Sequence, residues 1–170
     1  MELVNGKGRE KAFLQLFDEH HGALFRFAFR LTGSAADAED VVQECFLELV
    51  RPTCAFVPAR APLRTWLFGI ARNQSLKRLR RRESVGAEAA GTLTPETELL
   101  RTELSELVGH AVLQLPEKQR EVLVLAHYEK MPLAEIAALL EIDLGAVKSR
   151  LQRARAALKE SLAACRSEKK

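Results

Sequence analysis

Apolar residues recur at intervals of three and four along most of the chain, the spacing that gathers them on one face of an α-helix. Before residue 83 this pattern predicts three helices, over about residues 10–31, 35–50 and 63–82. After residue 95 it predicts four more, over about 96–113, 116–128, 132–140 and 144–164. No segment alternates with a period of two for long enough to suggest a sheet. The pattern therefore predicts an all-α fold.

Polar residues between these segments mark where helices end and begin. Gly33 follows the first helix and suits the left-handed position after a helix C-terminus. Ser34, with Asp37 three residues later, resembles a capping box and predicts the start of the next helix. Pro52 ends that helix, and a proline-containing loop from about residue 51 to 62 precedes the third.

A small, polar, glycine-containing stretch divides the chain into two parts. All eight Phe and the only Trp lie before residue 70, whereas the only Tyr lies after it. The two parts are therefore expected to build separate cores. We predict two small helical domains, residues 1–82 and 96–170, joined by a flexible linker at 83–95.

Charge is distributed unevenly, although the formal net charge is only +3. Residues 37–49 contain five acidic and no basic side chains, and residues 64–82 contain seven basic and no acidic ones. Residues 144–170 add eight basic side chains against two acidic ones. Two basic blocks on one chain suggest two places that meet a polyanion.

Residues 133–151 have the pattern of a helix-turn-helix. Ile136 and Leu140 face inward from a short helix, and Asp143 is expected to cap the next one. The inward stripe of that second helix has a three-four spacing and consists of Leu144, Val147, Leu151, Ala154 and Leu158. Its opposite face carries basic and amide groups that could meet base edges in a major groove. The alternative is an ordinary pair of packed helices with a solvated basic face.

The predicted helix at 63–82 combines basic and aromatic side chains. Its expected inward stripe is Leu63, Trp66, Leu67 and Ile70. Its expected outward face is Arg64, Phe68, Arg72, Ser75, Leu79 and Arg82. Arginines interleaved with rings suit single-stranded nucleic acid, with Trp66, Phe68 and Phe56 as candidate stacking residues. The alternative is that these rings belong to the core, where large aromatic side chains are usually found.

The helix at 35–50 carries an acidic stripe. Its carboxylates recur every three or four residues, at Asp37, Asp40, Glu44 and Glu48. Such a stripe repels DNA but complements a basic partner protein. The alternative is a solvated face without a partner.

The order of four motifs resembles a known family. The motifs are Ser34 to Leu47, Phe56 to Asn73, Leu115 to Leu125 and Leu144 to Arg155, and they extend over nearly the whole chain. Together they resemble bacterial RNA polymerase sigma factors of the extracytoplasmic-function (ECF) group. The resemblance implies a promoter-specificity subunit with a region 2-like domain for polymerase docking and the −10 element, and a region 4-like domain for the −35 element.

The resemblance also implies roles for residues at matching positions. The residues expected to bind core RNA polymerase are Asp37, Asp40, Gln43, Glu44 and Phe46. Those expected to bind the −10 element are Ala59, Arg60, Ala61, Arg64, Trp66, Arg72, Asn73 and Lys77. Those expected to bind the −35 element are Lys148, Ser149, Arg150, Gln152 and Arg153. Glu141 stands where the family's turn usually has glycine, so a left-handed Glu there would cost about 1–2 kcal/mol.

Further expectations concern partners. The resemblance implies core RNA polymerase and promoter DNA, duplex at −35 and melted at −10. It also implies an anti-sigma factor, which would hold the two domains packed together and hide their basic faces. No heptad seam is present, so no stable homo-oligomer is expected.

Composition narrows the remaining classes of function. Three Cys without a CxxC motif suggest a reducing compartment, and the absence of a signal-peptide pattern or a long apolar run suggests a cytoplasmic protein. No catalytic motif is apparent, so neither an enzymatic activity nor a cofactor is expected. Two alternatives stay open: an autonomous helix-turn-helix regulator, and a metal- or redox-sensing protein that uses His20, His21, Cys45, Cys54 or Cys165. The histidine and cysteine spacing matches no zinc pattern.

Overall fold

The computed structural model describes residues 6–51, 53–54, 56–85 and 103–167. All regular structure in these ranges is helical, which confirms the predicted fold class. The N-terminal domain consists of α1 (Gly6–Thr32), α2 (Ala35–Val50) and α3 (Leu63–Val85). The C-terminal domain consists of α5 (Glu103–Leu113), α6 (Glu117–Leu123), the π-helical turn η1 (Val124–Tyr128), α7 (Leu133–Leu140) and α8 (Leu144–Ser167). None of the helices in the described ranges is long and apolar enough to cross a membrane.

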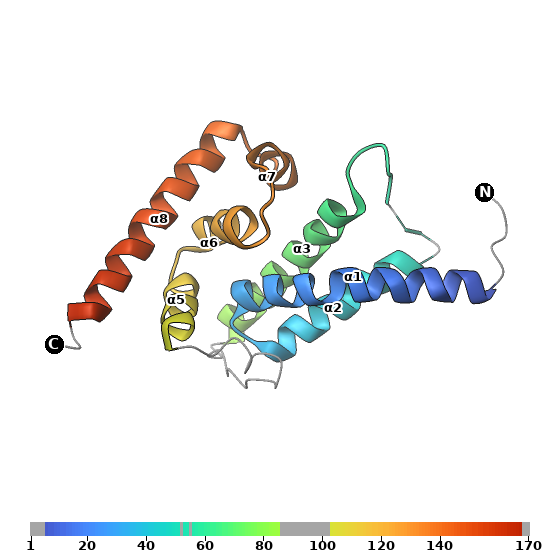
Figure 1. Ribbon diagram of the computed structural model, residues 1–170, viewed down its shortest axis with the longest axis horizontal. Coiled ribbons are helices and arrows are strands. Elements are labelled where there is room, and N and C mark those ends of the chain that lie inside the picture. The colour runs from blue at the N-terminus through green and yellow to red at the C-terminus, as the bar shows by residue number, and fades with distance from the viewer. Residues whose placement is uncertain (1–5, 52, 55, 86–102, 168–170) are drawn as a thin grey trace.

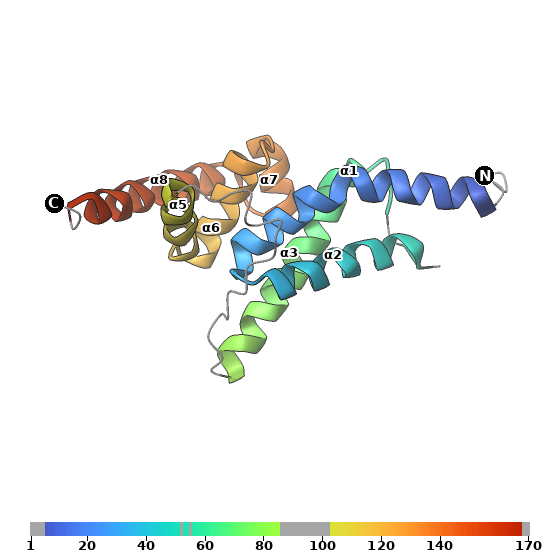
Figure 2. The same cartoon turned by 60° about the horizontal axis from the view of Figure 1, so that its bottom comes forward.

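The three helices of the N-terminal domain pack against one another, and α3 crosses both α1 and α2 (Figure 2). Phe27 of α1 meets Phe68 of α3 edge-on, with ring centroids 5.0 Å apart. Val41 and Cys45 of α2 complete the centre, and all four side chains are almost inaccessible to water. The Cys45 thiol donates to the backbone oxygen of Leu67 at 3.8 Å.

The corner between α1 and α2 is built as the sequence predicted. Gly33 has φ +69°, a backbone conformation that suits glycine. Ser34 then caps α2, because its hydroxyl accepts a hydrogen bond from the Asp37 backbone N–H at 3.2 Å. The corner fixes the direction of α2 relative to α1, and therefore the direction in which the acidic stripe faces.

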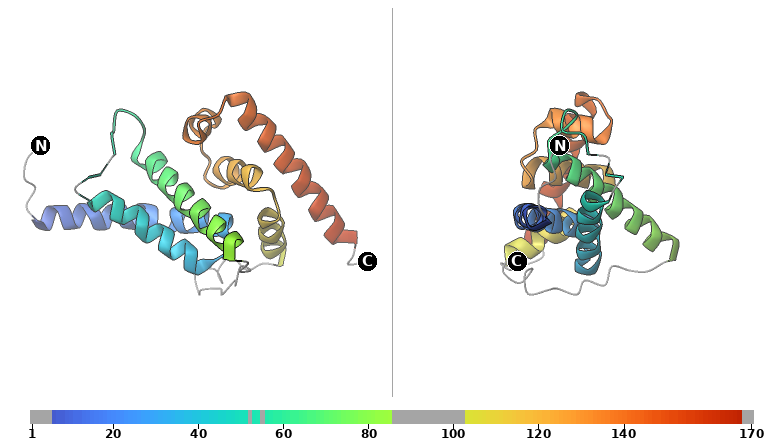
Figure 3. Two further views of the ribbon diagram at one scale, coloured as in Figure 1. Left: turned by 180° about the vertical axis from the view of Figure 1, so that it is seen from behind. Right: turned by 90° about the vertical axis from the view of Figure 1, so that its right-hand side faces the viewer.

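In the C-terminal domain, α6 and α7 lie between α8 and the N-terminal domain (Figures 1 and 3). The helix predicted at 116–128 is continuous, but its last turn is a π-turn. The Glu129 N–H donates to the backbone oxygen of Val124, five residues earlier, at 3.1 Å. This wider turn delivers Tyr128 and Glu129 toward α1 and α3.

The helix-turn-helix predicted at 133–151 is present as α7, a short turn and α8. Val147, Leu151 and Ala154 of α8 are buried, as expected. Leu144, also expected to face inward, is 42% exposed because it occupies the first turn of α8, beyond the edge of the core. Glu141 is left-handed at φ 54°, and Asp143 caps α8 by accepting from the Ala146 N–H at 2.8 Å.

Two expectations about burial were wrong. Phe68 and Ser75 were placed on the outward face of α3 but are buried, whereas Leu63, Trp66 and Ile70 are only half-buried. The expectation of separate cores was also wrong, since buried residues of both domains form one continuous cluster. Both errors have one physical cause. Helix α3 contacts α1 and α2 on one side and α7 on the other, so its apolar contacts are not confined to a single stripe.

The predicted linker lies largely outside the described residues. Helix α3 continues to Val85, three residues past the predicted boundary, and residues 86–102 are not described. The expected helix start at Thr94 and Pro95 falls in that undescribed range.

Candidate nucleic-acid interface

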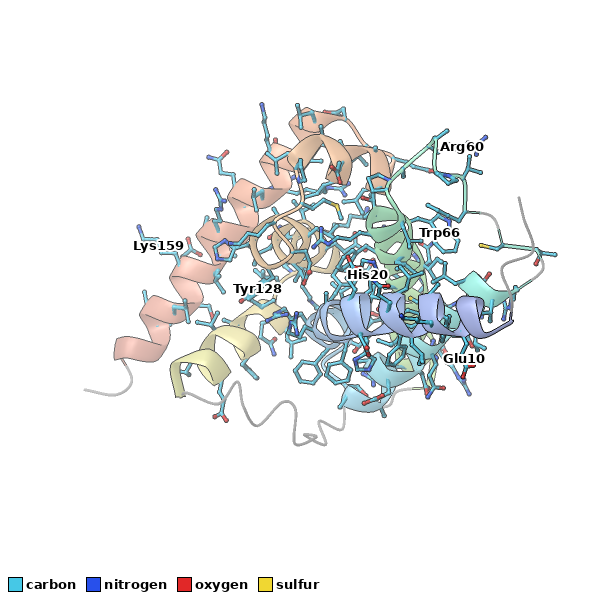
Figure 4. The ribbon with its side chains drawn as sticks, turned by 45° about the vertical axis from the view of Figure 1, so that its right-hand side comes forward. Glu10, His20, Arg60, Trp66, Tyr128 and Lys159 are labelled. Carbon is cyan, nitrogen blue, oxygen red and sulfur yellow. The ribbon has the colours of Figure 1, made fainter. Side chains whose placement is uncertain are left out.

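The loop before α3 presents the residues expected to read the −10 element. Ala59 and Arg60 are exposed and Ala61 is half-buried, and the turn is closed by an Arg60 N–H to Val57 oxygen hydrogen bond of 2.9 Å. At its base the Phe56 ring packs against Trp66, with centroids 5.4 Å apart. Figure 4 shows Arg60 at the tip and Trp66 below it, beside α3. The structure thus brings a ring pair and an exposed arginine to one edge of the N-terminal domain.

Downstream on α3, the polar side chains form two groups. Asn73 and Lys77 are exposed, as a surface that binds phosphates requires. Arg78 and Arg82 instead turn toward α2: Arg78 Nη2 lies 3.5 Å from Asp40 Oδ2, and Arg82 forms an ion pair with Asp37. A hollow between α2 and α3 is lined by these acidic and basic groups. The acidic stripe is therefore partly neutralised by the helix beside it.

The residues expected to bind polymerase differ in accessibility. Gln43 is exposed, the Asp40 side chain is 60% exposed, and Glu44 is half-buried beside Arg51. Phe46 is buried, and its ring packs against Phe13 and Phe17. Asp37 is the most enclosed carboxylate of the stripe, because it is held by Arg82.

Two arginines of the predicted −10 surface face the C-terminal domain. Arg64 Nη2 donates to the backbone oxygen of Glu129 at 2.7 Å and lies 3.4 Å from its carboxylate. Arg72 Nε lies 3.2 Å from the Glu121 carboxylate. Neighbouring Thr65 donates its hydroxyl to Glu135 at 3.1 Å. The pattern along α3 predicted these arginines, but not their partners.

The end of α1 supplies a second set of contacts to the C-terminal domain. The Arg30 guanidinium lies over the Tyr128 ring, 4.0 Å from its centroid. Arg120 donates to the backbone oxygen of Leu31 and, at 3.0 Å, to that of Leu115. Arg120 thereby satisfies a carbonyl at the C-terminal end of α1, where helix carbonyls lack partners of their own.

Burial perturbs the acids at this interface. Desolvation raises the pKa of Glu121, and the attraction of Arg72 only partly offsets the rise. Desolvation likewise raises the pKa of Glu129 against the opposing effect of Arg64. Elsewhere, burial raises the pKa of the Cys45 thiol to about 12, so this thiol is protonated at neutral pH.

The recognition face of α8 is open to solvent. Lys148, Ser149, Gln152 and Arg153 are exposed, and Arg150 is half-buried. Arg153 Nε donates to the backbone oxygen of Ser149 at 3.3 Å, which lays its guanidinium along the helix. The five residues expected to bind the −35 element therefore lie together on one helix.

Within the described ranges, no three His, Cys, Asp or Glu side chains are arranged as metal ligands. Cys45 is in the core, Cys54 is half-buried in the loop after α2, and His20 is half-buried on α1. These described residues therefore provide no metal site that would support the alternative of a metal-sensing protein.

Comparisons with known proteins match both domains. The family model for Sigma-70 region 2 matches residues 16–85, and that for Sigma-70 region 4 matches residues 105–158. The ECF RNA polymerase sigma factor SigW of Bacillus subtilis (strain 168) is 32% identical, over 92% of this chain and 91% of the relative. SigL of Mycobacterium tuberculosis, also an ECF RNA polymerase sigma factor, is 38% identical over 95% of this chain and 96% of the relative.

Solved structures match the chain over both domains as well. The sigma factor RpoE from Bartonella quintana, in complex with the anti-sigma factor NepR, superposes with a TM-score of 0.75 at 28% identity, over 90% of this chain and 98% of that one. CnrH, in complex with the cytosolic domain of CnrY, gives a TM-score of 0.70 at 32% identity, over 93% and 92%.

Proposed function

This chain belongs to the ECF group of sigma-70 factors, and we propose that its three charged surfaces have separate roles: one docks on the polymerase, one binds the −10 element and one binds the −35 element. The chain is a promoter-specificity subunit, which binds core RNA polymerase and directs transcription initiation at −10 and −35 elements. The observation that carries the division of roles is the separation of two basic surfaces on two domains, with an acidic helix beside one of them.

The proposed polymerase-docking surface is the solvent side of α2. Asp40, Gln43 and Glu44 are accessible and offer acceptors to a basic partner helix. Asp37 and Phe46 have a supporting role, because Asp37 is paired with Arg82 and the Phe46 ring packs between α2 and α1.

The proposed −10 surface comprises the loop and the exposed side of α3. Ala59, Arg60 and Ala61 would read an extruded base, with Trp66 and Phe56 forming the adjoining wall. Arg64, Arg72, Asn73 and Lys77 would hold the phosphates. Captured bases would offset the unstacking cost of melting, a few kcal/mol per step.

The proposed −35 surface is the exposed face of α8. Lys148 and Ser149 lie on one turn in the N-terminal half of the helix and Gln152 lies on the next, and it is the N-terminal part of a recognition helix that contacts base edges in the major groove. Arg150 and Arg153 flank them and suit phosphate contacts. We assign residues 1–85 to the first module, because α3 ends at Val85, residues 86–95 to the linker and residues 96–170 to the second module.

Regulation by an anti-sigma factor fits the same assignment. One structural relative, the sigma factor RpoE from Bartonella quintana, is bound to the anti-sigma factor NepR. We propose that the chain acts where RNA polymerase acts, in the cytoplasm, and by binding alone rather than by catalysis.

Co-elution with core RNA polymerase tests the docking surface. The unsubstituted chain should co-elute, and the double variant Asp40→Arg, Glu44→Arg should not, because it presents positive charge to a basic partner. The matched control is Glu10→Arg, Glu19→Arg, which reverses two exposed acids on α1 and should co-elute normally. Thermal unfolding of each variant checks that α2 still packs on α3, because Asp40→Arg places a positive charge beside Arg78.

Failure of the unsubstituted chain to bind polymerase would contradict the proposal. Binding to duplex DNA alone, as a dimer, would instead support an autonomous helix-turn-helix regulator.

A further inference from the structure

The acidic stripe of α2 is paired along its whole length with arginines of the same chain. Each of its four carboxylates has an arginine nitrogen within 4.0 Å. The pairs are Asp37 with Arg82, Asp40 with Arg78, and both Glu44 and Glu48 with Arg51. With the three arginines counted, the net charge of the stripe falls from −4 to −1. The surface proposed to dock on the polymerase therefore carries much less negative charge than its carboxylates alone suggest.

Arg82 differs from the other two arginines, because it also holds the fold together. Besides its ion pair with Asp37, it donates to the backbone oxygen of Thr32, the last residue of α1, at 3.0 Å. The side chains of Arg82 and Asp37 are only 21% and 20% exposed. This pair joins α3 to the corner between α1 and α2, so its role is structural.

Arg51 approaches the stripe from the end of α2 itself. It follows the last residue of this helix and reaches back to Glu48 and Glu44. Its Nη2 lies 3.7 Å from Glu44 Oε2, and its side chain is 49% exposed. Because all three residues belong to one helix and its end, these ion pairs are not needed to join α2 to α1 or α3.

Arg78 approaches the stripe from α3. Its Nη2 lies 3.5 Å from Asp40 Oδ2, while the Asp40 side chain remains 60% exposed. Lys77 and Arg81 line the same hollow between the two helices as Asp40 and Glu44 do. A basic group that approaches Asp40 from solvent therefore meets the positive charge of α3 beside it.

Exposed ion pairs of this kind are weak and can be exchanged. Each corresponds to a factor of at most about five in an equilibrium constant. They nevertheless lower the attraction for a basic partner, because positive charge beside a carboxylate opposes the approach of more positive charge. Replacing such an arginine should then strengthen docking instead of weakening it.

On the basis of the docking role proposed for α2, we propose that Arg51 and Arg78 compete with the polymerase for the carboxylates of the acidic stripe, and so lower the affinity of this chain for core RNA polymerase. On docking, basic groups of the polymerase replace the two arginines at Asp40 and Glu44. The two arginines thereby set how tightly the chain docks and how steeply docking depends on salt.

The first test measures binding of each variant to immobilised core RNA polymerase over a range of salt concentrations. At low salt, Arg51→Gln, Arg78→Gln should bind about threefold to tenfold more tightly than the unsubstituted chain, because two weak competing pairs are lost. The gain should shrink at high salt, where exposed charges are screened. The matched control is Lys11→Gln, Lys159→Gln, which removes two exposed positive charges outside α2 and α3 and should bind as the unsubstituted chain does.

A double-mutant cycle tests whether the gain acts through the carboxylates. Arg78→Gln should tighten binding in the unsubstituted chain but have little effect in the Asp40→Asn background, where its partner is absent. An equal gain in both backgrounds would overturn the proposal, since Arg78 would then act elsewhere.

Arg51 provides a test that does not depend on the packing of α3. Arg51→Gln alone should tighten binding about twofold, whereas Arg51→Lys keeps the charge and should stay close to the unsubstituted chain. Thermal unfolding checks that each variant is folded. Weaker or unchanged binding of a folded Arg51→Gln chain would contradict competition, because an arginine that only supports α2, or that itself contacts the polymerase, cannot lower the affinity.

Two outcomes separate this inference from the proposed function. If Asp40→Arg, Glu44→Arg binds polymerase as well as the unsubstituted chain does, the docking role of α2 fails and the competition fails with it. If docking requires these carboxylates but Arg51→Gln, Arg78→Gln binds no more tightly at low salt, the competition alone is wrong.

Discussion

Glu141 ends α7 in the left-handed region of backbone space, with φ 54° and ψ 44°. The side chain is exposed, and no described residue gives it a hydrogen bond or ion pair that would offset the strain. A non-glycine residue there costs roughly 1–2 kcal/mol. Glycine would remove this strain, but it would also raise the entropy of the unfolded chain, which offsets part of the gain. The turn of the helix-turn-helix is therefore maintained against a local preference.

Replacing Glu141 with glycine should stabilise the chain by about 0.5–1 kcal/mol, because the strain exceeds the entropic cost of glycine. Urea unfolding followed by circular dichroism measures the change. The control is Ala138→Gly at an exposed position of α7, which should destabilise the chain by about 1 kcal/mol, since glycine is unfavourable inside a helix. Destabilisation by both substitutions would show that Glu141 is not strained.

At the scale of the element, α8 depends on its cap. Asp143 accepts from the Ala146 N–H at 2.8 Å and also brings a negative charge near a helix proposed to approach phosphates. These two effects can be separated by substitution.

Asp143→Ala should lower the free energy of unfolding by about 1 kcal/mol, because the first turn of α8 loses its acceptor. Asp143→Asn keeps an acceptor and should stay within a few tenths of a kcal/mol of the parent. Both remove the charge, so both should bind duplex −35 DNA somewhat more tightly at low salt once folded. Equal losses of stability in the two variants would contradict the capping role.

Local features of the helices were predictable because they depend on neighbouring residues. The Ser34 cap, the left-handed Gly33 and the helix-turn-helix all follow from short-range chemistry. The buried face of α3 was not predictable in the same way, because Phe68 and Ser75 are covered by elements distant in the sequence. Glu121 is the clearest case, because a Glu followed by five apolar residues gave no sign that its partner, Arg72, lies in the other domain.

At the scale of the whole molecule, the two domains share one core and one set of ionic contacts. The match to RpoE extends over both domains of a factor held by its anti-sigma factor. The domains of this chain pack together without a bound partner, and the expectation that an anti-sigma factor holds them together stays a prediction. The candidate surfaces could be located from the sequence, but the contacts of Arg64 and Arg72 with the C-terminal domain could not, because they depend on how the domains dock.

The packing of the two domains also makes stability depend on pH. The pKa values of Glu121 and Glu129 are raised by burial, so the folded chain binds protons more tightly than the unfolded chain does. A raised carboxyl pKa penalises the fold at neutral pH, and the penalty is relieved as pH falls through the raised pKa toward the ordinary Glu value.

The free energy of unfolding of the parent, minus that of Glu121→Gln, should therefore increase as pH is lowered from 7 toward about 4.3. Urea titrations of both chains across this range measure the difference. Comparison with Glu160→Gln, an exposed position, removes the general effect of one lost charge. A difference that decreases with falling pH would mean that Arg72 outweighs burial at this carboxyl.

The π-turn at Val124–Tyr128 also limits which changes in gene length the protein tolerates. A hydrogen bond that reaches back five residues instead of four accommodates one more residue than a regular helix would. Deleting a single codon there would remove the extra residue, so that a regular α-helical turn could keep the downstream residues near their present positions. Glu129 would then still reach Arg64, whereas a further inserted codon would rotate Glu129 and α7 by roughly 100° about the helix axis and separate them from α3. We therefore expect this turn to tolerate the loss of one residue better than the gain of one.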